Sequence, residues 1–509
     1  MFRWLMPALM LCAATVALAA DFTLREDLNR TWTRECVTFP LTAAHQQQAR
    51  AGRPLLDQDG KPVVYQVYTG TDGMARIAFQ TDLAPLTTRT FSFAAQGRAD
   101  AATDLHIEET AEGIRLTNGQ TGIALAKAPA AGHGPIAGIR LRSGKWAGGS
   151  RLTADAPLTA WTVTVTARGP VFTEAVCTVA FGEGGRWESR YRLYAGEPVV
   201  LIDEHAAVDA KARLTLMLSD NFTAESLFFR SGDSPYGKNM VWKMETGPVF
   251  DWEPWLRWHA SVRRGSTFSV FNAAENDLLS VAAGFAGAWV DPQLPWDKQA
   301  HPPLKVVKDD AGVHADLPLM HGQRKWMVGA FERDATLAIM DDPNTALASP
   351  LPYRYLIKYG HFPLDMIKDY VLHWPHALEH PRLLMTQKDV ERFRAGVKDL
   401  APYQREVQQF LTYVPGNRGK ALNQHNMDDA IPAYLATQDP EMGAMMARRV
   451  ITMYEDAINY LIDQDGLPFG AAPHHQQSTA TAVGLADVIY SSPHTTPAQR
   501  ERLCALAAF

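Results

Sequence analysis

The pattern of apolar residues changes near residue 350, and this change constrains the fold more than any other feature of the sequence. Before it, apolar and polar residues alternate in runs such as LTAWTVTVTARG and RWESRYRLYAG, which is typical of β-strands that bury one face. After it, the stretch FPLDMIKDYVLHW spaces its apolar residues three and four positions apart, which is typical of an amphipathic helix. The sequence therefore predicts a β-rich part followed by a helical part.

Composition and the first residues favour an exported globular protein. The 509 residues are 46% hydrophobic and carry a net charge of −6, so no basic excess predicts nucleic-acid binding. Residues 1–20 combine Arg3, a short apolar run and a small-residue cleavage site, which predicts a secretory signal peptide. That run is too short to span a membrane, and no later segment is long and apolar enough. We therefore expect a secreted or periplasmic protein with no membrane contact after cleavage.

Three cysteines remain after the predicted cleavage, which is too few for a disulfide framework in a chain of this size. Cys177 alternates with apolar neighbours in an expected strand, so we expect it to be a buried small residue. A disulfide between two of Cys36, Cys177 and Cys504 is left open by the sequence, and so is the oligomeric state.

Turn residues and strand spacing divide the chain further. Strands recur at intervals of roughly 8–12 residues over much of the β-rich part, which favours a β-sandwich. The pair Asp59-Gly60 predicts a hairpin turn in a smaller β unit that precedes it. The predicted segments are a signal peptide (1–20), a small β domain (21–103), a β-sandwich domain (104–345), a connector (346–379) and a helical domain (380–509).

The stretch HPRLLMTQKDVERFR, from His380 to Arg394, marks the expected start of the helical domain. Thr386 suits an N-cap, and Asp389 three residues later nearly matches a capping box. Further helices are expected to begin at Pro440 and Pro497, because each proline follows a residue that can cap a helix.

Two segments of the helical part resemble a known architecture. HPRLLMTQKDVERFRAGV resembles a segment of heparinase II/III-like and alginate-lyase-like proteins, where such a loop, cap and helix open an (α/α) toroid. STATAVGLADVIYSSPHTTPAQRERLCALAAF resembles a later part of that toroid. The order of small β domain, β-sandwich and helices is similar to exo-acting rhamnogalacturonan-lyase-like proteins. The resemblance implies a multidomain fold, β then α, with a C-terminal (α/α) toroid.

The implied toroid is longer than the helical part of this chain. Toroids of the families named above are about twice as long as residues 380–509, so we expect this toroid to be truncated. The apolar face of the last expected helix (Leu503, Leu506 and Phe509) favours the same interpretation, because no partner follows it in the sequence. A short helical appendage that ends there is the alternative.

The resemblance implies a polysaccharide lyase that cleaves a uronic-acid-containing polysaccharide or oligosaccharide by β-elimination. Such an enzyme neutralises the sugar carboxylate and removes the C5 proton with a positioned base. A glycoside hydrolase of the same architecture, which needs two carboxylates facing a cleft, is one alternative. A non-catalytic glycan-binding protein is the other.

Amide and imidazole side chains that suit this chemistry gather just before two expected helices. They are Asn423, His425 and Asn426 in NQHNMDD, and His474, His475 and Gln476 in PHHQQST. The histidines are candidate acids or bases and the amides are candidate substrate ligands, with helix caps and solvated histidines as the alternative. Tyr454 is a further candidate acid, and Arg418 is a candidate partner of the sugar carboxylate.

Tryptophan is concentrated in the stretch FDWEPWLRWH. Trp252 and Trp255 are candidate platforms on which a sugar ring could stack. Packing in the core or at a domain interface is the alternative, and we favour it, because aromatic side chains bury large areas.

No metal or cofactor is expected from the motifs. His373, His376 and His380 have a spacing that suits a metal, but Pro375 and Pro381 interrupt the helix that would align them. Neither a phosphate-binding glycine loop nor a nucleophile elbow occurs in the sequence.

Overall fold

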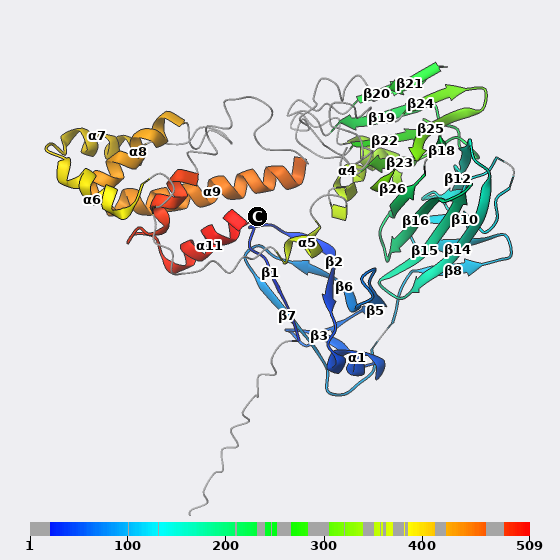
Figure 1. Ribbon diagram of the computed structural model, residues 1–509, viewed down its shortest axis with the longest axis horizontal. Helices are drawn as coiled ribbons and strands as arrows, with labels where there is room; N and C mark the ends of the chain where they lie inside the picture. Colours follow the sequence, from blue (N-terminus) through cyan, green and yellow to red (C-terminus); the bar gives the residue numbers. More distant parts are fainter. Residues whose placement is uncertain are drawn as a thin grey trace, which may run out of the picture.

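The structure is a computed structural model, and it describes most of the chain after residue 20. The described residues are 21–99, 101–130, 132–208, 211–231, 240–245, 247–251, 266–283, 305–319, 321–338, 351–356, 358–359, 363–369, 381, 385–412, 424–464 and 483–508. Figure 1 shows the larger sheets at one end of the long axis and the helices at the other, with the small N-terminal sheets between them. The predicted fold class is confirmed in its coarse form: antiparallel sheets come first and helices follow.

The first described residues form two small antiparallel sheets and one helix. The sheets have the strand orders β1-β7-β3-β4 and β2-β6-β5. The elements are β1 (Phe22–Arg25), β2 (Trp32–Pro40), α1 (Ala43–Arg50), β3 (Leu55–Asp57), β4 (Pro62–Val63), β5 (Tyr65–Thr69), β6 (Ala75–Leu83) and β7 (Thr88–Phe93). Asp59 and Gly60 connect β3 to its antiparallel partner β4, and Gly60 adopts a φ of +75°, so the predicted hairpin turn is confirmed.

Three larger antiparallel sheets follow. Two have five strands each, in the orders β12-β11-β10-β9-β8 and β13-β18-β25-β24-β21, and one has nine, in the order β14-β15-β16-β17-β26-β23-β22-β19-β20. The strands are β8 (His106–Glu109), β9 (Gly113–Thr117), β10 (Gly122–Ala126), β11 (Ile136–Arg140), β12 (Trp146–Ala147), β13 (Ser150–Ala154), β14 (Leu158–Arg168), β15 (Phe172–Phe181), β16 (Gly185–Tyr194), β17 (Val199–Ala207), β18 (Ala212–Met217), β19 (Ser226–Ser231), β20 (Met240–Lys243), β21 (Gly247–Asp251), β22 (Ser266–Phe271), β23 (Asp277–Ala283), β24 (Lys305–Asp309), β25 (Gly312–Leu319) and β26 (Gly322–Glu332). The two alternating runs of the sequence analysis form β14 and β16.

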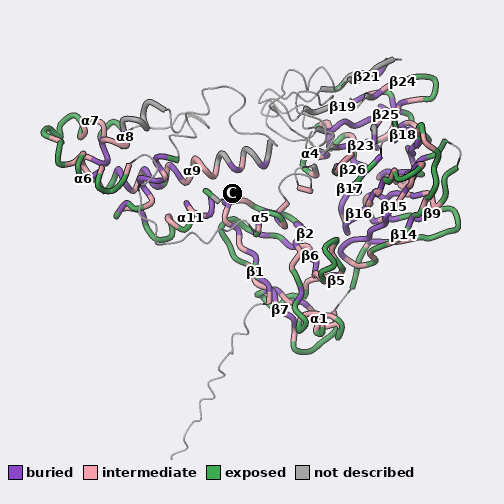
Figure 2. Tube along the Cα trace, in the orientation of Figure 1, coloured by how far each residue is buried: buried purple, intermediate pink, exposed green. Residues whose placement is uncertain are grey.

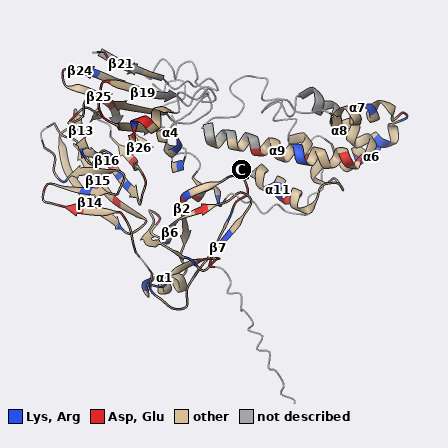
Figure 3. Ribbon diagram, turned by 180° about the vertical axis from the view of Figure 1, so that it is seen from behind, with Lys and Arg blue, Asp and Glu red and all other residues tan. Residues whose placement is uncertain are grey.

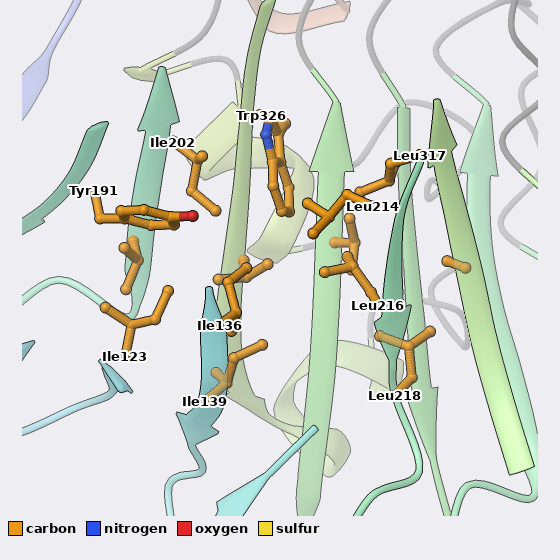
Figure 4. Close-up of a cluster of buried hydrophobic side chains, with 14 of the residues drawn as sticks. Ile123, Ile136, Ile139, Tyr191, Ile202, Leu214, Leu216, Leu218, Leu317 and Trp326 are labelled. Atoms are coloured by element: carbon orange, nitrogen blue, oxygen red, sulfur yellow. The ribbon is translucent and has the colours of Figure 1, made fainter. Parts of the chain in front are cut away.

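The nine-stranded sheet packs its inner face against the two five-stranded sheets, as a sandwich does. Tyr191, Ile202 and Trp326 project from the nine-stranded sheet into this core (Figure 4). Ile136 and Leu214 meet them from the two smaller sheets. Each fully buried side chain of this size contributes about 1.5–3 kcal/mol through the hydrophobic effect. The apolar residues that alternate along the strands therefore form the core of the sandwich.

The three cysteines after residue 20 are free thiols. Cys177 is completely buried in the sandwich core, so the prediction of a buried small residue is confirmed. Cys36 is buried too, and Cys504 is half-buried.

A second core joins the three parts of the described chain. Leu24 and Phe79 come from the N-terminal sheets, Phe331 comes from the outer face of the nine-stranded sheet, and Ile458 and Leu506 come from the helices. The same buried cluster contains all five side chains, and Figure 2 shows buried positions in each of the three parts. The N-terminal sheets are therefore packed against both neighbours rather than attached by a linker alone. The predicted domain boundaries stay predictions.

The helical part contains several helices. They are α3 (Arg333–Leu337), α4 (Leu351–Leu356), α5 (Leu364–Ile367), α6 (Gln387–Gly396), α7 (Ala401–Thr412), α8 (Gln424–Thr437), α9 (Pro440–Gln464) and α11 (Pro497–Ala508), and residues 483–490 are also helical. Short described loops join α6 to α7 and α8 to α9. Val407, Phe410, Met446 and Val450 belong to a core shared by α6 to α9 and α11. The toroid itself stays a prediction.

The predicted helix starts are confirmed. Thr386 and Asp389 form a reciprocal capping box at the start of α6. α9 begins at Pro440 and α11 begins at Pro497, as expected from the cap-and-proline pattern. These signals lie within four residues of chain, so they do not depend on tertiary packing.

One expectation about the last helix is wrong. Leu503 and Leu506 do not lack partners, because both are buried, Leu503 in the helical core and Leu506 in the core that joins the three parts. The sequence did not reveal the partner of Leu506, because that partner includes strands more than 400 positions earlier in the chain. Phe509 lies outside the described residues.

Basic and acidic residues are both scattered over the sheets and the helices (Figure 3). Among the described residues, no helix is long and apolar enough to cross a membrane.

Candidate functional site

Most of the site residues expected from the sequence fall where the structure gives no side-chain description. Arg418, Asn423, His474, His475, Gln476, Trp252 and Trp255 lie outside the described residues, as do His373, His376 and His380. His425 and Asn426 lie in the first turn of α8, and only their backbone is described. The roles expected for all of these residues stay predictions.

Tyr454 is the one expected catalytic residue whose side chain is described. It lies on α9, half-buried against both the helical core and the core that joins the three parts. Burial raises the pKa of its hydroxyl. The surroundings of Tyr454 are those of a packing residue, and its predicted role as an acid is not tested by this placement.

A different cavity is present where the N-terminal sheets, the nine-stranded sheet and the α5 segment meet. Its volume is about 190 Å³, which gives room for one small polar ring. Carboxyl, aromatic and cationic side chains line it together: Glu35, Asp203, Asp365, Tyr68, Tyr194, Tyr359, Arg192, Lys325 and Lys358. We call this cavity the junction pocket. None of these residues was singled out from the sequence.

Asp365 holds the α5 segment against the free edge of β2. Within the described part of the chain β2 pairs with β6 alone, so its other edge has backbone groups without a strand partner there. The Asp365 carboxylate accepts hydrogen bonds from the backbone N–H of Thr38 and, at 2.8 Å, from its hydroxyl. Lys368 Nζ lies 3.3 Å from the same carboxylate. With these three partners, Asp365 serves to dock one wall of the junction pocket.

Lys358 closes a second wall by contacting two parts of the chain. Its Nζ lies 3.0 Å from a carboxylate oxygen of Glu197 in the turn between β16 and β17. It also donates to the backbone oxygens of Thr33 and Arg34 at 3.1 and 3.0 Å. Arg34 adopts a φ of 50° beside an irregularity in the pairing of β2 with β6, which aims its carbonyl away from the ladder. One ammonium group thus links β2, the β16–β17 turn and the connector.

Glu35 follows Arg34 on β2 and is almost fully buried, with 6% of its surface exposed. Burial raises the pKa of its carboxyl to about 7, because the charged form loses hydration. Lys358 and the backbone N–H of Leu364 oppose that rise, and the nearby carboxylate of Glu197 adds to it. Glu35 therefore holds its proton in about half of the molecules at neutral pH.

Aromatic rings form the rest of the wall. Tyr194 and Tyr359 stack with their centroids 5.2 Å apart and their planes 11° from parallel. The hydroxyl of Tyr359 is buried and has no hydrogen-bond partner among the described residues, although the ring is partly exposed. Burial raises the pKa of the Tyr359 hydroxyl well above its ordinary value. The ring of Tyr359, rather than its hydroxyl, is the part that lines the pocket.

Arg192 supplies a fixed cation beside these rings. Its Nε donates to Glu174 at 2.8 Å, and its guanidinium lies 4.5 Å from the centroid of the Phe172 ring. Its Nη1 lies 3.4 Å from the Tyr194 hydroxyl. Because these contacts hold the guanidinium from several sides, Arg192 presents a preorganised positive charge to the pocket.

The pocket can therefore bind a polar ring and give a proton to it. It combines a carboxyl that is protonated in part at neutral pH, tyrosine rings and three cations. The histidines of the described chain do not line it, and burial raises the pKa of Tyr68, Tyr194 and Tyr359. The described lining is suited to proton donation rather than to proton removal from carbon. No cluster of three or more potential metal ligands occurs among the described residues.

One sequence signal could have indicated the pocket. Glu35 stands in the run WTRECVTFP, where a carboxyl side chain occupies a position that the strand buries. A buried carboxyl needs a partner or a proton, so such a position is unusual. The partners Lys358 and Leu364 lie more than 300 positions away in the chain, and no local pattern identifies them.

Comparison with known proteins gives distant structural similarity only. No protein-family model matches the chain, and no curated protein matches it. Similar solved structures include a glycosyl hydrolase family 38 protein from Enterococcus faecalis, with a TM-score of 0.35 and 7% identity over 62% of this chain and 44% of that chain. An alpha-mannosidase from Enterococcus faecalis V583 has a TM-score of 0.34 and 9% identity over 62% of this chain and 43% of that chain.

A third similar structure is the galactosidase domain of an alpha-galactosidase-sucrose kinase, with a TM-score of 0.28 and 8% identity over 46% of this chain and 43% of that chain. This chain spans less than half the length of each of the three structures. All three are carbohydrate-active enzymes by their descriptions, and no lyase is among them. TM-scores of this size do not assign the chain to their fold.

Proposed function

We propose that the chain is a carbohydrate-active protein and that the junction pocket holds one sugar residue of its glycan. The observation that carries this proposal is the buried Glu35 carboxyl in a cavity that is also lined by tyrosine rings and the fixed Arg192 cation. Aromatic walls with a few convergent polar groups are the usual construction of a sugar site. The predicted signal peptide is consistent with a glycan met outside the cytoplasm, and we propose a secreted or periplasmic location.

Among enzymatic reactions, the pocket supports glycoside hydrolysis better than β-elimination. Hydrolysis needs a carboxyl that gives its proton to the glycosidic oxygen as the bond from that oxygen to the anomeric carbon breaks. Glu35 can supply this proton. Water then adds to the anomeric carbon and loses a proton to a second carboxylate. Asp203 suits that role better than Asp365, because it is exposed at the pocket and lies 4.0 Å from Lys325, whereas Asp365 is occupied in docking α5.

The lyase reading rests on the resemblance of residues 380–397 and on the clusters of histidine and amide residues after it. In that reading His425, Tyr454, His474 and His475 carry the acid–base steps, and the junction pocket lies away from the chemistry. The C5 base would then come from residues outside the junction pocket.

A non-catalytic glycan-binding protein is a second candidate. The Asp365 carboxylate favours this candidate, because it is already bound by Thr38 and Lys368. The pocket therefore has one carboxylate fewer for catalysis. Binding alone needs the aromatic wall and a cation, and both are present.

The three readings give different products. The full chain is incubated with pectic, alginate and glycosaminoglycan substrates and with neutral α- and β-linked glycans, and both reducing ends and unsaturated-uronate absorbance are measured. New reducing ends without that absorbance, abolished in Glu35→Gln, support hydrolysis in the junction pocket. Unsaturated product that Glu35→Gln leaves unchanged overturns the pocket assignment and supports the lyase. Glycan binding without product supports the binding protein, and the absence of binding and product together contradicts the proposal.

A further inference from the structure

We propose that β14 is an interface through which two copies of this chain join the edges of their nine-stranded sheets. β14 is the first strand of that sheet and pairs only with β15, so its other edge carries N–H and C=O groups without a strand partner among the described residues. Seven of its eleven residues are exposed, and Figure 2 shows exposed positions along this strand.

β14 lacks the short length, the charges and the prolines that protect other edge strands of the larger sheets, and its only irregularities are two register shifts near its ends. Proteins discourage edge pairing with short strands, charges and prolines. β20 has four residues and ends in Lys243, β8 carries two adjacent glutamates, and β21 contains Pro248. β13 has five residues and includes Arg151. By contrast, β14 runs through ten residues without a charge or a proline before Arg168.

The sequence of β14 is complementary to itself in an antiparallel pairing. Its ladder with β15 shifts register near both ends, between Leu158 and Ala160 and between Val165 and Ala167, so the regular part lies between these points. A two-fold axis at Val163 places Thr162 opposite Thr164 on the exposed face of this regular part. Threonine pairs of this kind are favourable across strands.

The same axis creates no electrostatic penalty. It places Trp161 opposite Val165 on the inner face, which is an aromatic and β-branched pair. The single charge of the strand, Arg168, falls opposite Leu158 and far from its own copy. The centre of β14 carries no charge that would favour a partner strand of different sequence. Pairing with a second copy gives hydrogen-bond partners to the unpaired edges of both chains in one contact. A second copy is therefore the occupant that the edge fits.

The self-association of the full chain tests the proposal. Sedimentation or light scattering over a range of concentrations is expected to show a reversible monomer–dimer equilibrium. Thr164→Lys places two ammonium groups beside the axis and is expected to weaken the dimer at least tenfold. Thr153→Lys, the same change at an exposed strand position of β13, is the matched control and is expected to leave the dimer intact. Circular dichroism confirms that both variants are folded.

A cross-link tests the register independently of any loss of binding. The double variant Thr162→Cys/Thr164→Cys is expected to form disulfides between copies under mild oxidation, because each cysteine then faces the other position of its partner. The cysteines that are already present on the described chain are mostly buried and give the background in the unmodified protein. A chain that stays monomeric at every concentration overturns the proposal, and so does a dimer that Thr164→Lys leaves unchanged.

Discussion

At the scale of single residues, the junction pocket depends on charged groups that the fold has removed from water. Lys358 is the counter-charge for the buried Glu197. Its charge also opposes the rise that burial causes in the pKa of Glu35. Such groups stabilise a structure only when all partners are in place, because a buried charge that loses its partner keeps the full cost of desolvation. The stability of the junction is therefore expected to respond to pH and to single substitutions.

Glu35 makes the stability of the protein depend on pH. Its pKa is raised from 4.5 to about 7 in the folded state, so folding binds the proton more tightly. The stabilisation is complete below the unfolded pKa and is lost as the pH rises through the folded one. Glu35→Gln cannot titrate, and we expect the wild-type free energy of unfolding to fall relative to the variant, by about 3 kcal/mol, between about pH 5 and pH 8. Urea unfolding at each pH measures this difference.

The control for that experiment is Glu183→Gln, an exposed glutamate in the turn between β15 and β16. Its difference from wild type is expected to stay constant over the same pH range. A flat difference for Glu35→Gln as well would show that the carboxyl is not desolvated in solution.

Removal of the junction cation is expected to be costly. Lys358→Met leaves Glu197 buried without a counter-charge and breaks the hydrogen bonds to two backbone oxygens. We expect a loss of about 3–5 kcal/mol in the free energy of unfolding. Lys325→Met is the matched control, because the Lys325 side chain is 68% exposed and lies 4.0 Å from Asp203. A change within about 0.5 kcal/mol is expected there. Equal effects for the two lysines would contradict the structural role of Lys358.

At the scale of elements, the sequence predicts most where the signal is local. The strand alternation of β14 and β16, the hairpin turn at Gly60 and the starts of α6, α9 and α11 are all found where the sequence places them. Each depends on neighbouring residues only. The short α5 is different: the sequence predicts a helix over FPLDMIKDYVLHW, the described helix spans Leu364–Ile367 only, and its docking on β2 through Asp365 is a distant contact that periodicity does not indicate.

The capping box of α6 gives a prediction at this scale. Thr386→Ala removes the side chain that caps the helix and releases the Asp389 carboxylate from its hydroxyl partner. We expect a local loss of about 1 kcal/mol. Hydrogen exchange of the backbone amides of residues 387–390 measures it and should accelerate several-fold. Thr159→Ala, at an exposed position of β14, should leave those amides unchanged. Unchanged exchange in Thr386→Ala would mean that tertiary packing alone holds the start of α6.

At the scale of the whole molecule, the sequence did not predict how its parts join. The expectation of an unpartnered last helix fails, because Leu506 packs in a core that also holds Leu24, Phe79 and Phe331. Arg25 on β1 and Glu501 on α11 add an ion pair at 2.9 Å. The junction pocket arises from the same contacts between distant segments. Contacts of this kind leave no trace in local periodicity, so neither the pocket nor the shared core could be derived from the sequence.

This shared core predicts that the helices stabilise the N-terminal sheets. Leu506→Ala opens a cavity between α11, α9 and the first strands, with an expected cost of about 2–5 kcal/mol. Hydrogen exchange should rise in β1 as well as in α11. Leu400→Ala, at an exposed position between α6 and α7, is the control and should change neither. An effect confined to α11 would show that the N-terminal sheets do not share a core with it.

The location of bound sugar tests the central proposal most directly. The measurement is an experimental structure of the Glu35→Gln variant with an oligosaccharide that the protein binds. The account predicts a sugar ring in the junction pocket, beside the Tyr359 ring, with one hydroxyl at the side chain of position 35. Sugar bound only at residues 413–426 or 465–482, with the junction pocket empty, would contradict it. That result would place the site at the histidine and amide clusters of the helical part.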